Sequence, residues 1–105
     1  MTAPAPAAAL SGNTLTVTGE VNADNVVALR TQGEQLISAA GGPVTVDLTG
    51  LATAHSAVLS MLLCWQRLAI GNRQSLTFRG ASDRLLSLAA LSSLENQIPG
   101  FATHS

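Results

Sequence analysis

Polar and apolar residues alternate with a period of two in the first part of the chain. In the stretch TLTVTGEV, Leu15 and Val17 alternate with threonines, which is typical of a strand with one buried face. The turn residues at 11–13 precede it, so a hairpin whose first strand covers residues 8–10 is expected. The short runs at 44–48 and 75–79 predict two further strands, carried by Val44, Val46, Leu76 and Phe78 among others.

Helical spacing of apolar residues appears between these predicted strands. Residues 24–40 form the first such segment, with Asn22 and Asp24 as candidate N-caps and a Gly-Gly-Pro end at 41–43. A second helix is predicted over 57–70. A third begins after Ser82, with the expected apolar stripe Leu85, Leu88, Ala89 and Leu91. The segment after residue 96 stays unassigned, and Pro99-Gly100 argues against a long final helix.

This order of elements predicts an α/β fold with a mixed four-stranded sheet. Two strand–helix–strand crossovers make part of the sheet parallel and place the helices mainly on one face. The length of 105 residues and a hydrophobic content of 47% suit a single domain, which we assign to 10–105. The Pro/Ala-rich segment 1–9 is expected to be a flexible tail or a tail that leads into an edge strand.

Charge patterning narrows the classes of function. Charged residues make up only 10% of the chain and the formal net charge is −1, which disfavours nucleic-acid binding and a polybasic membrane patch. Such sparse charge indicates either a surface covered by a partner or a domain simply rich in Ala, Ser and Thr. The chain starts without a signal-peptide pattern, and no run approaches the roughly 20 apolar residues of a membrane span. We therefore expect a cytoplasmic protein.

No convincing catalytic or metal site is visible in the sequence. Cys64 is the only cysteine, so it is expected to be a small buried side chain rather than part of a disulfide. His55 could titrate near neutrality, but no metal-ligand partner lies near it, and adjacent residues at a helix start rarely form a Ser–His pair. Gly41-Gly42 is followed by a proline and does not make a phosphate loop. No cofactor is expected, and Asp47 is assigned to capping its turn.

The strand–turn–helix segment at 44–63 is the most informative stretch. Ser56 lies where a helix N-cap is expected, and the same free N–H groups would also favour a phosphate or a partner's acceptor. Leu59, Leu62, Leu63 and Ile70 are expected to face the sheet. The other side is apolar as well, and it carries Ala57, Met61, Cys64, Trp65 and Leu68. Either a neighbouring helix covers that side, or it is a partner groove with Met61 and Trp65 as anchors.

This segment resembles the STAS domain family, which includes the anti-sigma factor antagonists. Asp47-Leu48-Thr49-Gly50-Leu51 matches the first part of the family pattern, and His55-Ser56-Ala57-Val58-Leu59 occupies the second. The resemblance places Ser56 at the family's switch position and Leu59 at its core leucine. It departs from the family in having His55 for an acidic residue and Ala57-Val58 for the small-residue turn.

Within this family the sequence is most similar to the small STAS subunit of Mla-type phospholipid ABC transporters. That similarity extends to the last predicted helix through Gly80, Asp83, Leu88, Ala89, Leu91 and Leu94. It implies a non-catalytic subunit held at the inner membrane by the transporter's ATPase, in support of outer-membrane lipid asymmetry. The switch position and the second apolar side of the helix together predict partner binding at a set of seven residues: His55, Ser56, Ala57, Met61, Cys64, Trp65 and Leu68. Asp83 and Arg84 would flank the same surface.

Two alternatives remain open. One is an anti-sigma factor antagonist switched by phosphorylation of Ser56, and the other is a weak homodimer that pairs its apolar helix faces. If Trp65 and Met61 are anchors, Trp65→Ala or Met61→Asp should leave the fold intact and abolish binding to the ATPase.

Overall fold

The computed structural model describes residues 5–52, 56–92 and 98, which form one sheet and three helices. The strands are β1 (Ala7–Ser11), β2 (Thr14–Thr18), β3 (Val44–Asp47) and β4 (Leu76–Arg79), in the spatial order β1-β2-β3-β4. The hairpin β1–β2 is antiparallel, whereas β2–β3 and β3–β4 are parallel. This is the mixed four-stranded sheet that the sequence predicts.

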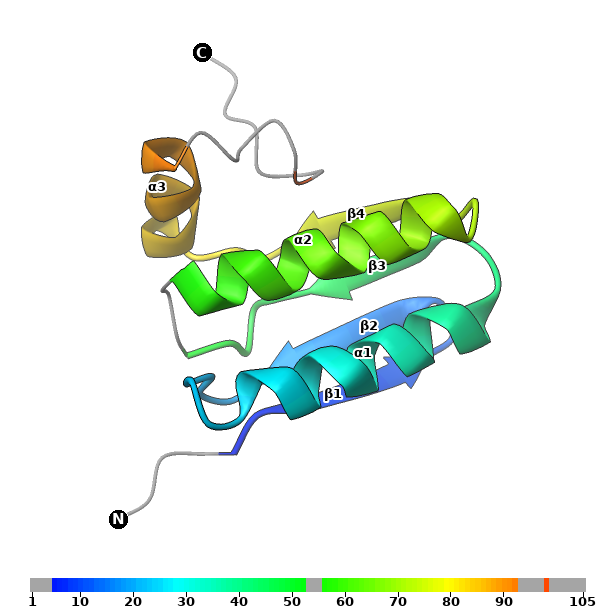
Figure 1. Cartoon of the computed structure of the whole chain (residues 1–105), viewed down its shortest axis with the longest axis horizontal. Coiled ribbons are helices and arrows are strands. Elements are labelled where there is room, and N and C mark those ends of the chain that lie inside the picture. Colours follow the sequence, from blue (N-terminus) through cyan, green and yellow to red (C-terminus); the bar gives the residue numbers. More distant parts are fainter. Residues whose placement is uncertain (1–4, 53–55, 93–97, 99–105) are drawn as a thin grey trace.

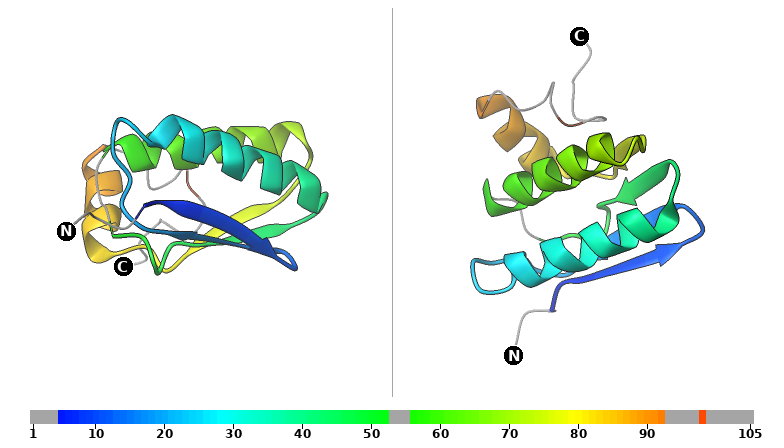
Figure 2. Two further views of the ribbon diagram at one scale, coloured as in Figure 1. Left: turned by 90° about the horizontal axis from the view of Figure 1, so that it is seen from below. Right: turned by 45° about the vertical axis from the view of Figure 1, so that its right-hand side comes forward.

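The two long helices, α1 (Val26–Ala40) and α2 (Ser56–Gly71), lie side by side on the same face of the sheet (Figures 1 and 2). The short helix α3 (Asp83–Leu91) lies at one end of the molecule, near the start of α2. Among the described residues, no helix covers the opposite face of the sheet (Figure 2). The prediction that the helices pack mainly on one face is therefore confirmed.

The N-terminal boundary of the domain differs from the sequence prediction. The expected hairpin is present, but β1 already begins at Ala7, and Ala7 pairs with Thr18. The prediction that the tail extends to residue 9 is wrong at its end, because residues 7–9 contribute backbone hydrogen bonds to the sheet edge. Ala8 is buried against the core. Residues 1–4 lie outside the described residues.

The core lies between the sheet and the two long helices. Leu15, Val17 and Val46 point from the strands and are fully buried, which is what the alternation along these strands predicts. From α1, Leu29 and Ile37 meet this layer at helical spacing. From α2, the buried residues are Val58, Leu59, Met61, Leu62, Trp65 and Ala69.

A close contact between α1 and α2 depends on Gly33. The indole of Trp65 lies over this glycine, so that a Cβ atom there would overlap the ring and meet its Nε1 atom at 2.7 Å. The Trp65 Nε1–H also donates a hydrogen bond of 3.0 Å to the carbonyl of Arg30, one turn earlier on α1. The indole thus fixes both the spacing and the register of the two helices.

Replacing Gly33 with alanine is expected to destabilise the protein, although alanine is favoured over glycine in helices by roughly 1 kcal/mol. Overpacking against the indole typically costs about 1–3 kcal/mol, and we expect this term to dominate. Urea unfolding of Gly33→Ala and Gly71→Ala provides the comparison, since Gly71 also lies in a helix but a Cβ there would meet nothing within 4 Å. Gly71→Ala should be neutral or slightly stabilising. Equal responses at both positions would contradict the packing described.

Candidate functional site: the helix starts at one end of the sheet

The N-terminal ends of α1 and α2 lie at the same end of the molecule as the carboxyl ends of the three parallel strands (Figure 1). The loops after β2 and β3 are held together there, because Gly19 N–H donates to the Gly50 carbonyl at 3.1 Å and Ala52 N–H donates to the Gly19 carbonyl at 2.8 Å. Helix N-termini carry free N–H groups and a partial positive charge. This end is therefore suited to contact a partner's acceptor groups.

Ser56 is the first residue of α2 and is exposed. The helix begins one residue earlier than the segment predicted from the sequence, and it extends to Gly71. His55 lies outside the described residues, so its predicted place at the rim of a contact surface stays a prediction. An exposed hydroxyl at a helix start can accept or donate in an interface, and it is accessible to modification.

Met61 and Trp65 do not form exposed anchors. Met61 is 1% exposed and Trp65 is 0% exposed, and both lie in the core between the helices. Of the two explanations left open for the second apolar side of α2, the neighbouring helix is correct for Met61 and Trp65, which are buried where α1 packs against α2. The expectation that Trp65→Ala or Met61→Asp leaves the fold intact is accordingly wrong, because both changes would disrupt buried packing.

The prediction of which residues of α2 face the sheet is also corrected in part. Leu59 and Leu62 are buried as predicted, and Leu63 is half-buried. Ile70, however, is 64% exposed. In helical projection it lies between Leu59 and Leu63, but it belongs to the last turn of α2, which ends at Gly71, at the end of the helix away from α3. On α3, Leu85 and Ala89 are buried and Leu88 is half-buried, but Leu91 is 85% exposed and does not belong to the predicted stripe.

The remaining predicted residues of α2 border a hollow against α1. Ala57 and Cys64 are half-buried in its wall, and the exposed Ser60 and the buried Met61 also line it. Leu68 is half-buried on the same side of α2, further along the helix. The hollow has a volume of about 230 Å³ and is mostly apolar. We call it the α1–α2 hollow, and its lining residues are Val26, Val27, Arg30, Ala57, Ser60, Met61 and Cys64.

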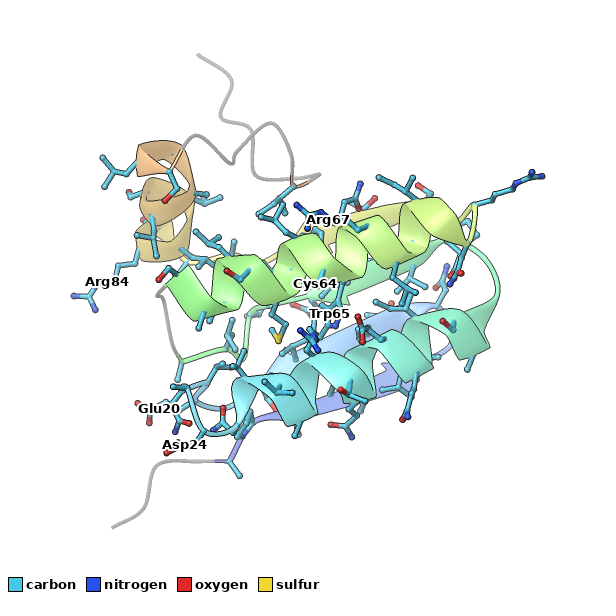
Figure 3. All side chains as sticks on the ribbon, in the orientation of Figure 1. Glu20, Asp24, Cys64, Trp65, Arg67 and Arg84 are labelled. Carbon is cyan, nitrogen blue, oxygen red and sulfur yellow. The ribbon has the colours of Figure 1, made fainter. Side chains whose placement is uncertain are left out.

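The α1 wall of this hollow was missed by sequence reasoning. Val27 is 58% exposed beside Val26, which packs partly into the core. Two adjacent residues point about 100° apart on a helix, so both valines cannot face the sheet. This pair of adjacent valines was the feature of the sequence that could have indicated an exposed apolar residue on α1. Figure 3 shows Cys64 on the side of α2 that faces α1, whereas Arg67 points to the opposite side.

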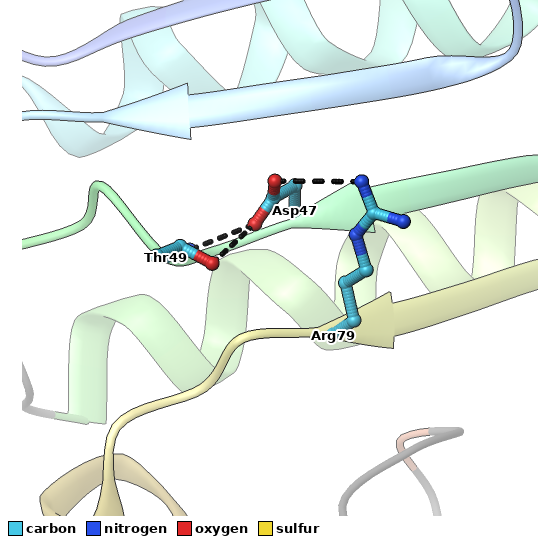
Figure 4. Close-up of polar contacts among 3 residues, drawn as sticks. All are labelled: Asp47, Thr49 and Arg79. Carbon is cyan, nitrogen blue, oxygen red and sulfur yellow. Dashed lines mark hydrogen bonds and ion pairs between the residues drawn. The ribbon is translucent and has the colours of Figure 1, made fainter.

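The turn after β3 is held by Asp47. Its Oδ1 atom accepts hydrogen bonds from the Thr49 backbone N–H at 3.0 Å and the Thr49 hydroxyl at 2.6 Å (Figure 4). Its Oδ2 atom lies 3.6 Å from the guanidinium of Arg79 on the neighbouring strand β4. The hydrogen bonds from Thr49 lower the pKa of the Asp47 carboxyl below its ordinary value of 3.8, and Arg79 lowers it further. The prediction that Asp47 caps its turn is confirmed.

The charge of Asp47 should make stability depend on pH. A carboxyl whose pKa is lowered in the folded state stabilises the fold above its unfolded pKa, and that contribution is lost as the pH falls through the folded pKa. We therefore expect Asp47→Asn to be less stable than the native chain near neutral pH, and the difference to shrink below about pH 4. Urea unfolding across the acidic range measures this. A difference that stays constant with pH would show that the charge contributes nothing.

Helix α3 begins as the sequence predicts. The Ser82 hydroxyl accepts a hydrogen bond of 3.1 Å from the Leu85 N–H, and Asp83 follows in the first turn. Asp83 and Arg84 are both exposed, and the side chain of Arg84 points away from the helices and the sheet (Figure 3). A role for these two residues at the edge of the contact surface stays a prediction.

Two features are absent from the described part of the chain: a cluster of metal ligands and a helix that could span a membrane. No three His, Cys, Asp or Glu side chains come close enough there to hold a metal ion. Within the same residues, none of the helices combines the length and the apolar character that crossing a membrane requires.

Comparison with known proteins identifies the family. The family model described as "Mlab, STAS domain" matches residues 5–100, which is nearly the whole chain. The chain belongs to the STAS domain family. A search of curated proteins found no match.

A solved structure with the same fold is that of the anti-sigma factor antagonist SpoIIAA in its unphosphorylated form. It superimposes with a TM-score of 0.69 over 90% of this chain and 85% of that one, at 15% sequence identity. At this identity the likeness concerns the fold, and it agrees with the mixed sheet and three helices described above. STAS domains and SpoIIAA-like proteins are generally non-catalytic regulators that act through protein–protein contacts.

Proposed function

We propose that this chain is a non-catalytic subunit that binds the ATPase of an ABC-type phospholipid transporter and regulates or stabilises it. The observation that supports this most is the α1–α2 hollow, which is open and apolar and lies close to the exposed Ser56. A chain with only 10% charged residues and an open apolar hollow is suited to a protein partner. The match to the Mlab-type family model supports the choice of an ABC ATPase.

Docking at this surface would act on the ATPase by differential binding. A ligand shifts a conformational equilibrium only as far as it prefers one state, so the chain must contact a surface that the active or assembled ATPase presents. The hollow would supply the central contact, and Ser56 and Leu68 would lie around it. Through this complex the chain would lie at the cytoplasmic face of the inner membrane and serve outer-membrane lipid asymmetry.

An anti-sigma factor antagonist is the second candidate. It is favoured by the accessible hydroxyl of Ser56 at the positive end of α2, where a phosphate would be stabilised by N–H groups. Phosphorylation of Ser56 would add negative charge at the N-terminus of α2 and would thereby alter partner binding. A homodimer built on Met61 and Trp65 is disfavoured, because pairing them would require the core to open.

Co-purification of the tagged chain from its native host separates these proposals. We expect an ABC ATPase and its permease to be recovered in stoichiometric amounts after mild detergent extraction. Recovery of a serine kinase that binds a sigma factor, without transporter subunits, would contradict the proposal. Intact-mass measurement of the same material would detect a phosphate on the chain, and light scattering of the purified chain would detect a dimer.

A further inference from the structure

Arg30 is the charged residue among those that line the α1–α2 hollow. It is half-buried on α1, and its backbone carbonyl is held by the indole of Trp65, so the position of its backbone is fixed. Its Nε atom is buried and has no hydrogen-bond partner among the described residues. A buried N–H group without an acceptor is costly, and the cost is larger for a charged group. Arg30 therefore brings a positive charge and an unsatisfied donor to the lining of this hollow.

No acidic side chain of the described chain neutralises Arg30. The ion pair found among the described residues joins Arg79 on β4 to Asp47 at the end of β3. Glu20 and Asp24 lie in and beside the loop before α1 (Figure 3), and Glu34 lies one turn after Arg30 on α1. None of the three forms an ion pair with Arg30 in the described structure. An acceptor for the guanidinium must then come from solvent or from another molecule.

The rest of the hollow selects for apolar groups. Val26, Val27, Ala57 and Met61 line it with hydrocarbon and a thioether, while Cys64 adds a thiol and Ser60 a hydroxyl. The exposed Val27 would gain free energy on burial by a partner's side chain. The volume of about 230 Å³ is enough for one or two side chains and is too small for an element of secondary structure. The occupant must therefore combine a short apolar group with an anion.

We propose that the α1–α2 hollow receives a segment of the partner protein in which an aliphatic side chain lies beside an Asp or Glu carboxylate. The aliphatic group packs on Val27, Ala57 and Met61, and the carboxylate accepts hydrogen bonds from Arg30. Guanidinium and carboxylate match in charge and in planar geometry, which makes the pair selective as well as stabilising. This inference rests on the proposed function for the location of docking, and it adds the chemistry of the partner.

Disulfide exchange at Cys64 tests the chemistry of the hollow without the partner. Cys64 is the only cysteine of the chain and lies in the wall of the hollow. The probes are aliphatic disulfides of equal length that end in a carboxylate, an amide, an ammonium or a phosphonate group, exchanged at equilibrium in excess reducing thiol. Intact mass measures capture by the folded chain, and capture by the chain unfolded in urea corrects for intrinsic reactivity.

We expect the folded chain to retain the carboxylate probe about tenfold better than the amide probe, as a charge-assisted hydrogen bond predicts. The preference should disappear in Arg30→Gln and persist in Arg30→Lys, with thermal unfolding confirming that both variants fold. Equal capture of carboxylate and amide, a preference that survives in Arg30→Gln, or no capture of any probe would overturn the inference. Stronger capture of the phosphonate would also overturn it in favour of a phosphate ligand.

Binding to the co-purified ATPase separates this inference from the proposed function. Ser60→Trp fills the hollow, whereas Arg30→Gln removes only the charge. If Ser60→Trp abolishes binding and Arg30→Gln leaves it unchanged, the docking site stands and the carboxylate contact is refuted. If the native chain does not bind the ATPase but still selects the carboxylate probe, the proposed function fails and the chemistry of the hollow stands.

Discussion

Replacing Trp65 with alanine is expected to lower the free energy of unfolding by about 3–5 kcal/mol. The indole is completely buried between α1 and α2, and its removal would leave a cavity directly above Gly33. Because glycine has no side chain, α1 offers nothing that could relax into this space. The variant would also leave the Arg30 carbonyl without the donor that now lies 3.0 Å away. This is a large share of the stability of a small domain.

Urea unfolding followed by circular dichroism measures the effect, with Trp65→Phe and Leu91→Ala as comparisons. Trp65→Phe keeps an aromatic ring and loses the hydrogen bond, so its loss should be clearly smaller than that of alanine. Leu91 is 85% exposed, and its replacement should change stability by no more than about 0.5 kcal/mol. Unchanged stability of Trp65→Ala would mean that the indole is not a core residue.

Replacing Gly80 with alanine is expected to cost about 2–5 kcal/mol, from two separate causes. Gly80 has a φ angle of +75°, a left-handed conformation that costs other residues roughly 1–2 kcal/mol. In addition, a Cβ atom there would overlap the hydroxyl of Thr49 and lie 2.9 Å from its backbone nitrogen. Overpacking of this kind typically costs about 1–3 kcal/mol. The overlap would displace the turn that Asp47 holds.

Gly12 provides a matched control for the conformational term. Its φ angle is +61°, and a Cβ atom there would meet nothing within 4 Å. Gly12→Ala should therefore show the conformational cost alone, and the excess loss in Gly80→Ala should report the contact with Thr49. If urea unfolding gives the same loss of unfolding free energy for both variants, the contact between the turns after β3 and β4 does not affect stability.

The strands and the order of elements were predictable from local pattern. Residues such as Val44 and Val46 alternate with polar neighbours, and the Gly-Gly-Pro stop marks the end of α1, so little beyond chain periodicity was needed. The start of β1 was less predictable, since Ala7 and Ala8 have weak strand preference and join the sheet only through pairing with β2. Tertiary pairing decided that boundary.

The site was predictable only in part, because its walls come from two helices. The sequence showed that α2 is apolar on two sides, but it could not show what covers the second side. The deciding residue is Gly33, whose missing side chain admits the indole of Trp65, and this complementarity exists only in three dimensions. For the same reason, Val27 and Arg30 could not be placed opposite Cys64 from helical spacing alone.

The most direct test of docking at the α1–α2 hollow is the affinity of the purified chain for its ATPase after matched substitutions at Val27 and Ile70. Both are β-branched and similarly exposed, at 58% and 64%, but only Val27 lines the hollow. Isothermal titration calorimetry should show at least a tenfold loss of affinity for Val27→Lys, as expected for a central contact, and no change for Ile70→Lys. Unchanged affinity in Val27→Lys, or a loss confined to Ile70→Lys, would contradict docking at this hollow.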